Sequence, residues 1–428
     1  MNSKVFNNAK WIIVCKVAQS VLALVVSMLS ARYLGPSNFG IINYAASLVS
    51  FVVPIMYLGV NNIIVQEIIY NPEKEGEVLG TSIAMTLLSS MFCIIGVVSF
   101  AYIANPGETA TILVCFIYSF TLFFQSTELI QYWFQAKLLS KYTSVIMVVA
   151  YFLVSVYKVS LLVLKKSVYW FALSHSLDFF LVSVGMYVVY RKIGGQCLTY
   201  SHISAKKLFL KGRYYIVSSM MITIFAQTDK IMLKALLNEN AVGYYSAAVS
   251  CAGMTSFVFA AIINSMRPVI LEKKLLNEKD YKLNLVRLYS IIIYFALAQS
   301  VVICLFSEYI IFVLYGEMYK PAASALAIIV WYTTFSYLGA VRDVWILAEE
   351  KQRYLWILNL SGACMNVFLN AILIPQYGIN GAAFSSLITQ IFTNVIMGFI
   401  MKPIRENNMI MLKGLNPKLV FNIISKLH

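Results

Sequence analysis

The sequence predicts an all-α membrane protein of about twelve transmembrane helices, arranged as two six-helix lobes around a central cavity. Composition is the first reason: 60% of the 428 residues are hydrophobic and only 12% are charged. A soluble domain carries about 25% charged residues, so lipid must replace water around most of this surface. The other two reasons are a series of long apolar segments and an internal repeat, described in order below.

Twelve segments are long and apolar enough to cross a membrane, since a spanning helix needs about 20 such residues. Turn residues separate them, for example Gly35-Pro36, Asn105-Pro106-Gly107 and the segment from Pro375 to Gly378. The gaps between the segments are too short to hold a soluble domain. The predicted spans are 11–33, 39–65, 79–104, 110–136, 143–164, 168–190, 213–237, 241–268, 284–306, 321–347, 354–374 and 379–401.

Lys and Arg fall mostly on one side of these spans, notably in 191–213, 267–287 and 402–426. Because cytoplasmic loops are enriched in Lys and Arg, the asymmetry places both termini in the cytoplasm. It also accounts for the net charge of +15 without a nucleic-acid partner.

The chain lacks the usual sequence signals of enzymes and metal sites. Its seven cysteines are isolated, and it has neither a CxxC pair nor an HExxH, GxGxxG, GxSxG or Walker A pattern. We therefore expect no catalytic residue, no bound metal and no resident cofactor.

Two pairs of segments indicate an internal repeat. Residues 39–47 align with 242–250, and 133–142 align with 345–354 at an offset of 212, matching Trp133 to Trp345. Halves with an even number of spans share one orientation, so an axis along the membrane normal should relate them. The predicted divisions are a first lobe at 1–195, a basic cytoplasmic linker at 196–212, a second lobe at 213–402 and a basic cytoplasmic tail at 403–428.

Polar side chains recur at helical spacing within several spans, a pattern typical of helices that line a cavity. Packing between helices is the open alternative, since it also selects small and polar residues. The candidate cavity residues are Gln19, Ser20, Ser27, Asn43, Ser47, Gln227, Asn366 and Asn370.

Ionisable residues within the spans supply candidates for two roles. Asp229, Asp178 and Glu128 are candidates for ion coupling, with a structural ion pair as the alternative. Four cations are candidates for binding an anionic substrate, although Arg267 also fits a lipid-headgroup anchor; they are Lys16, Lys158, Lys230 and Arg267.

Two further charged positions lie at span ends. Arg342 and Asp343 are adjacent at an inner end, where an ion pair or loop anchor is expected and gating is the alternative. Lys234 is expected to extend its ammonium to the outer membrane surface.

Several segments carry a resemblance to the polysaccharide-unit (Wzx-type) flippases of the multidrug/oligosaccharidyl-lipid/polysaccharide exporter superfamily. They are Ala31–Gly40, Gln227–Ile231, Val242–Ala248, Leu314–Ala323 and Asn366–Ala383. The resemblance implies transport of an undecaprenyl-diphosphate-linked oligosaccharide across a bacterial inner membrane, for O-antigen or capsule synthesis. It also implies alternating access, coupling to H⁺ or Na⁺ in some members, a role for Asp229, and partners among polysaccharide polymerase and export machinery.

Other functions stay open at this point. A drug or cation antiporter of the same superfamily would favour an acidic cavity, whereas this chain places lysines in its spans. A membrane-embedded polymerase or glycosyltransferase would be expected to carry a large outer loop, and a scaffold would not need the polar stripes.

Overall fold

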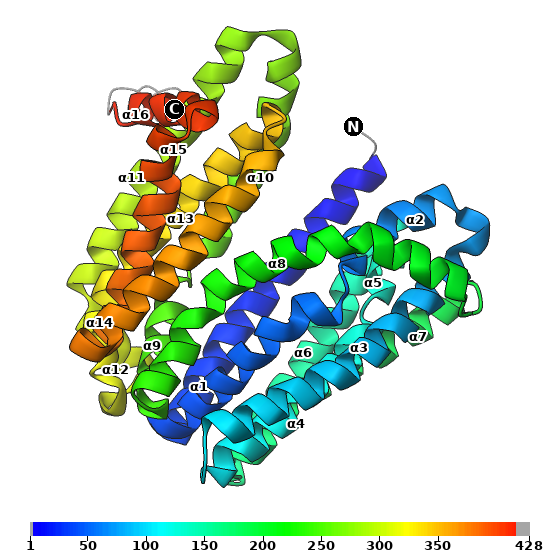
Figure 1. The fold of residues 1–428 in the computed structure, drawn as a ribbon, viewed down its shortest axis with the longest axis horizontal. Coiled ribbons are helices and arrows are strands. Elements are labelled where there is room, and N and C mark those ends of the chain that lie inside the picture. Colours follow the sequence, from blue (N-terminus) through cyan, green and yellow to red (C-terminus); the bar gives the residue numbers. More distant parts are fainter. Residues whose placement is uncertain (1–2, 417–428) are drawn as a thin grey trace. The chain divides into compact units, whose positions relative to one another are not determined.

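The computed structural model describes residues 3–416, with side chains from residue 19 onward. Within that range the chain forms helices and turns without a strand, and it divides into two compact units, residues 1–231 and 232–428 (Figure 1). This division falls inside a helix, α8 (His202–Leu236). The lobe boundaries drawn from the sequence therefore stay a prediction.

Unit 1 is built from helices that pack around α1 and α4. α1 contacts α3, α4 and α6, while α4 lies against α3 and α7. The helices are α1 (Ser3–Met56), α2 (Ile64–Tyr70), α3 (Glu75–Ala104), α4 (Thr109–Thr127), α5 (Ile130–Ala136), α6 (Ser140–Val163), α7 (Val168–Lys192) and most of α8.

Unit 2 packs around α13, which contacts α9, α11 and α14. Its core includes the fully buried side chains of Trp345, Tyr281 and Tyr289. The helices are α9 (Glu239–Ala252), α10 (Ser256–Leu276), α11 (Glu278–Leu305), α12 (Ser307–Tyr315), α13 (Ala322–Ala348), α14 (Leu355–Ile391), α15 (Met397–Ile400) and α16 (Arg405–Gly414).

Two of the longest elements are each a pair of helices that meet at a glycine. Gly35 has φ 71° inside α1, and Gly378 has φ 59° inside α14, values that L side chains rarely adopt. Pro36 and Pro375 flank these breaks; proline suits the first turn of a new helix but weakens a helix interior. Both breaks fall where the sequence predicted span ends.

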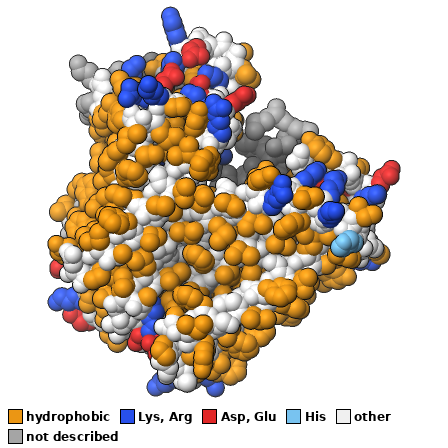
Figure 2. All heavy atoms as spheres, in the orientation of Figure 1, with side chains coloured by type: hydrophobic (Ala, Val, Ile, Leu, Met, Phe, Trp, Pro, Cys, Tyr) orange, Lys and Arg blue, Asp and Glu red, His pale blue; other side chains and the backbone are white. Residues whose placement is uncertain are grey.

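Among the described residues, nine helices are long and apolar enough to cross a membrane, or ten if the bent pair α9 and α10 is one span. Two of the nine, Gln19–Met56 and Gln352–Ile400, contain the glycine breaks at Gly35 and Gly378, where the sequence predicted two spans each. On the face shown in Figure 2, hydrophobic side chains cover the middle of the helices, and charged side chains gather near their ends.

The internal repeat is visible in the backbone. Leu138 and Glu350, 212 positions apart, each adopt a left-handed conformation just after a helix, with φ 57° and 54°. The matching tryptophans Trp133 and Trp345 are buried, and each has a lysine ammonium near its ring. The offset predicted from sequence thus relates equivalent turns of the two units.

One predicted span limit is wrong. The span expected at 39–65 ends at Met56, because Leu58 (φ 53°) and Gly59 (φ 71°) turn the chain before the short helix α2. The span expected at 110–136 is confirmed as Thr109–Ala136, within which the chain forms α4 and α5.

Candidate functional site

The first candidate site lies inside unit 1, where α7 packs against α4 and α6. Serine and threonine hydroxyls fix α4 against α7: Ser183 donates to the Phe124 carbonyl at 2.7 Å, and Ser176 donates to the Ile117 carbonyl at 3.1 Å. Thr127 adds a 2.5 Å bond to the Ser183 hydroxyl. These bonds set the rotation of α7 and so direct its remaining polar side chains.

Three ionisable residues meet in this packing. Lys158 on α6 is 9% exposed and interacts electrostatically with Asp178 on α7, which in turn interacts with Glu128 at the end of α4. Asp178 Oδ1 is buried without a hydrogen-bond partner within the described residues. The charge of Lys158 therefore partly offsets the cost of burying the Asp178 carboxylate.

The sequence assigned these residues to separate roles, and the structure places Lys158 near Asp178, and Asp178 near Glu128. Lys158 was a candidate substrate cation, whereas Asp178 and Glu128 were candidates for ion coupling. Charged groups that lie near one another within membrane spans are candidates for binding a proton, a cation or an anion.

The other predicted site residues are distributed differently. Asp229 is buried on α8, and the partly buried Lys230 beside it interacts with it electrostatically, while Arg267 on α10 is exposed. Gln19, Ser20, Ser27 and Gln227 are partly or fully exposed. Lys16 lies in α1, but its side chain is outside the described residues.

Four predicted cavity residues take part in hydrogen bonds within their own helices. Asn43 Nδ2 donates to the Phe39 carbonyl at 2.9 Å, and the buried Ser47 donates to the Asn43 carbonyl at 2.9 Å. Asn370 Nδ2 donates to Asn366 Oδ1 at 3.0 Å, and both asparagines are fully buried. In this conformation Ser47, Asn366 and Asn370 do not face open space.

The expectation for Lys234 is wrong. Its side chain is 4% exposed, and its ammonium pairs with Glu239 at 2.9 Å instead of reaching the membrane surface. Glu239 begins α9 directly after Asn238, whose side chain caps that helix by accepting from the Ala241 amide. The turn between α8 and α9 therefore places the Glu239 carboxylate next to Lys234.

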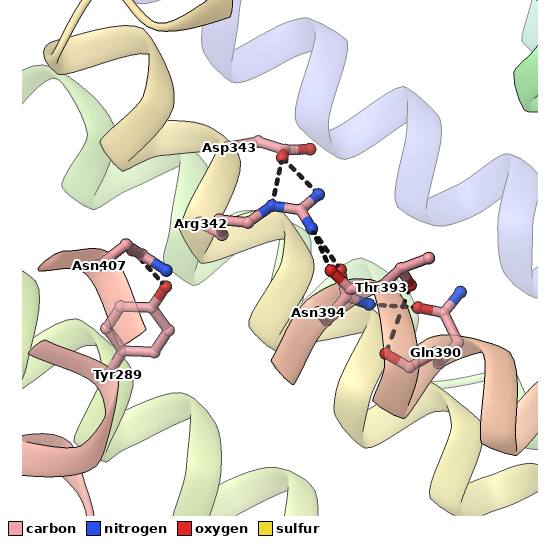
Figure 3. A network of polar contacts seen from close by, with 7 residues as sticks. All are labelled: Tyr289, Arg342, Asp343, Gln390, Thr393, Asn394 and Asn407. Atoms are coloured by element: carbon pink, nitrogen blue, oxygen red, sulfur yellow. Dashed lines mark hydrogen bonds and ion pairs between the residues drawn. The ribbon is translucent and has the colours of Figure 1, made fainter. Parts of the chain in front are cut away.

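A second candidate site surrounds Arg342 in unit 2 (Figure 3). The expected ion pair with Asp343 is confirmed at 2.9 Å. Sequence reasoning missed the other partners: Arg342 Nη1 donates to Asn394 Oδ1 at 2.8 Å and to the Thr393 carbonyl at 3.1 Å. Asn394 also donates to Gln390, and the i, i+4 spacing of these two amides was the available signal.

The backbone around Asn394 is shaped for this contact. Phe392–Ile396 forms a π-helical turn, a feature that occurs often at functional sites. On the facing helix, a Cβ at Gly339 would lie 2.5 Å from Asn394 Oδ1. A larger residue at this position would therefore have to displace the Asn394 side chain that binds Arg342.

The same fold occurs in solved structures of membrane transporters and flippases. The lipid II flippase MurJ in an inward closed conformation has a TM-score of 0.64 at 16% identity, over 96% of this chain and 93% of that one. The eukaryotic MATE transporter AtDTX14 has a TM-score of 0.65 at 14% identity, over 96% and 98%. An inward-facing multidrug resistance MATE transporter of the MOP superfamily has 0.62 at 15%, over 93% and 95%.

The fold is therefore that of the two-lobe, multi-pass membrane transporters of the MOP superfamily. Residues 5–274 match the family described as polysaccharide biosynthesis protein, and the chain belongs to that family. An uncharacterized membrane protein of Methanocaldococcus jannaschii is 26% identical over 235 residues, which is 52% of this chain. The match spans 45% of that relative, about half of its length.

Proposed function

We propose that this protein is a flippase that moves an undecaprenyl-diphosphate-linked oligosaccharide from the cytoplasmic to the outer leaflet of a bacterial cell membrane. The match to the polysaccharide biosynthesis family carries the proposal. The shared fold with a flippase for another lipid-linked saccharide, lipid II, supports it. The product would serve O-antigen or capsule synthesis, with both termini of the chain in the cytoplasm.

The chemistry of such a substrate explains why a protein is needed. A diphosphate with several sugars cannot enter hydrocarbon unaided, whereas the prenyl chain can stay in lipid. Alternating access moves the headgroup through a polar interior while the lipid tail remains outside. Transport of this kind requires no covalent chemistry, consistent with a role that is not enzymatic.

Deletion of the gene tests the proposal directly. Cells without the protein should accumulate the lipid-linked oligosaccharide with its headgroup on the cytoplasmic side, and the wild-type gene should restore export. Unchanged surface polysaccharide and no accumulated intermediate in the deletion strain would refute the flippase function.

Ion coupling at Asp229 is part of the proposal, because this carboxylate is 6% exposed within a candidate membrane span. Replacement by Asn removes the charge and keeps the shape, so export by the Asp229→Asn variant should lose its dependence on pH or Na⁺. Wild-type transport by this variant across a range of pH and Na⁺ concentrations would assign coupling to Asp178 and Glu128 or to no carboxylate.

Lys16 and Lys158 are proposed to attract the diphosphate. The Lys16→Gln/Lys158→Gln double variant tests this role at matched expression, with complementation of the deletion strain as the measurement. Full complementation would exclude the pair as a required anion site.

Drug or cation efflux is the second candidate, favoured by the equally good structural match to MATE transporters. An antiporter would change the sensitivity of the deletion strain to cationic drugs and leave its lipid-linked oligosaccharides unchanged. The two measurements on one strain therefore separate the two functions.

A further inference from the structure

The guanidinium of Arg342 is anchored on one edge by unit 2 itself. Arg342 lies near the end of α13 and is 6% exposed. Its Nη1 donates to Asn394 Oδ1 at 2.8 Å and to the Thr393 carbonyl at 3.1 Å, both in the π-helical turn. Asn394 is in turn bound to Gln390, so this edge is oriented by a chain of buried amides (Figure 3).

Among the described residues, the opposite edge of the guanidinium donates its hydrogen bonds to one half-exposed carboxylate. Nε and Nη2 donate to Asp343 Oδ1 at 3.2 Å and 2.9 Å. The Asp343 side chain is 49% exposed, against 8% for the side chain of Arg342. Asp343 thus covers the edge of the buried cation that is not bound to Asn394 or Thr393.

The sequence positions of the two residues make this cover easy to remove. Adjacent residues on a helix point in different directions, so Arg342 and Asp343 meet only because their side chains bend toward each other. The bonds that hold Arg342 on its other edge do not involve Asp343. Rotation of the aspartate would leave the guanidinium in place with two free donors.

We propose that Arg342 is a binding site for a phosphate group of the transported lipid, and that Asp343 is an internal anion that this phosphate displaces. The proposal rests on the flippase function and names the residue that receives the anionic headgroup. Two parallel N–H donors match a phosphate as well as a carboxylate, which is why arginine is common at phosphate sites.

Exchange of one anion for another suits a transporter. The buried guanidinium always keeps a counter-charge, so binding avoids the cost of an unpaired cation. Return of Asp343 then helps to expel the phosphate, since conduction and transport require binding that is weak enough to reverse.

Binding of defined phosphates to the purified full-length protein tests the site. The protein is reconstituted in phosphatidylcholine nanodiscs and titrated with farnesyl diphosphate. Inorganic pyrophosphate and phosphatidylglycerol are then tested separately as competitors. Loss of the charged bonds in Arg342→Gln should weaken farnesyl diphosphate binding by about tenfold or more. Asp343→Asn should tighten it by about three- to tenfold, because the internal competitor no longer carries a charge.

The double variant isolates the competition. Tightening by Asp343→Asn should vanish in the Arg342→Gln background, as expected for two groups that act on one site. Arg353→Gln and Glu350→Gln are the matched controls, since both residues are exposed near the same end of α13. They change the net charge equally without touching the Asn394 network, and each should alter binding by less than about twofold.

Three results would overturn the inference. The first is an Asp343→Asn variant that binds farnesyl diphosphate no tighter than the wild type, although it keeps Arg342 and its anchors. The second is equal weakening by Arg342→Gln and Arg353→Gln. The third is competition by phosphatidylglycerol without competition by pyrophosphate, which would make Arg342 an anchor for membrane lipid.

The export assay tests the proposed function and the binding assay tests the proposed site, so each proposal can be refuted without the other. Normal export in the deletion strain, together with Arg342-dependent binding of diphosphate, would refute the proposed function and keep the site. Blocked export in that strain, with diphosphate binding that ignores Arg342, would keep the function and refute the site.

Discussion

Replacement of Glu67 by Gln should loosen the attachment of α8 to α2 in unit 1. Glu67 is 3% exposed, and its carboxylate pairs with Lys207 at 3.0 Å and with Lys211, one helical turn apart on α8. Gln cannot carry the charge that holds two ammonium groups. Both lysines would then face a neutral amide and repel each other.

The size of the loss in unfolding free energy follows from the exposure of the two lysines, and its pH dependence follows from the pKa of the Glu67 carboxyl group. Burial by itself would raise the pKa of Glu67, but the hydrogen bonds and charges of Lys211 and Lys207 outweigh burial and hold the pKa below its ordinary value. A carboxyl group whose pKa is lowered by folding stabilises the fold at pH values above its unfolded-state pKa. This stabilisation is lost as the pH falls through the folded-state pKa. Because the lysine side chains are about half exposed, we expect Glu67→Gln to lower the free energy of unfolding by about 1–2 kcal/mol at pH 7.

Thermal unfolding of the purified full-length protein in detergent measures this effect. The Glu67→Gln variant should melt at a lower temperature than the wild type at pH 7.5, and the difference should shrink as pH falls below about 4. Glu73→Gln is the control, since Glu73 is an exposed carboxylate in the next turn. Equal melting temperatures at pH 7.5, or a difference that persists unchanged at low pH, would refute the role of the Glu67 charge.

Three other variants test the packing. Gly339→Ala should displace Asn394 and lower the melting temperature by the equivalent of about 1–3 kcal/mol; full stability would contradict the close contact. Lys158→Met should cost about 1 kcal/mol by removing the positive charge near Asp178, and adding Asp178→Asn should restore part of that loss, as a double-mutant cycle of unfolding would show. Leu138→Gly should leave stability unchanged or raise it by up to about 1 kcal/mol, since φ is 57°, rather than cause the loss that glycine brings within a helix.

The helical architecture was predictable because hydropathy and turn residues act locally. Gly35 and Gly378 stand at breaks within long apolar stretches, and each break was predicted from the neighbouring proline. The turn at Leu58 was not predictable in this way, because it is itself apolar and hydropathy does not report backbone direction. The repeat was recoverable since it preserves large side chains such as Trp133 and Trp345 at one offset.

The individual charged residues of the sites were predictable from the sequence, but the contacts between them were not. Lys158, Asp178 and Glu128 stood out because charges are costly in a membrane span. Whether they lie near one another depends on how the helices are rotated about their axes. Hydrogen bonds between helices, such as that of the Ser183 hydroxyl, fix this rotation only in the folded unit. The same limit hid Asn394, an ordinary polar residue until a π-helical turn directs it at Arg342.

The cations of the two candidate sites share one property that bears on transport. Lys158 has Asp178 near it, and Arg342 has Asp343, so each buried positive charge is accompanied by a carboxylate with some access to the outside. A bare buried cation would bind a diphosphate tightly and release it slowly, whereas a paired cation exchanges one anion for another. If headgroup transfer uses either residue, its rate should therefore depend on the neighbouring carboxylate as much as on the cation. A variant that tightens binding by removing that carboxylate should then slow export instead of improving it.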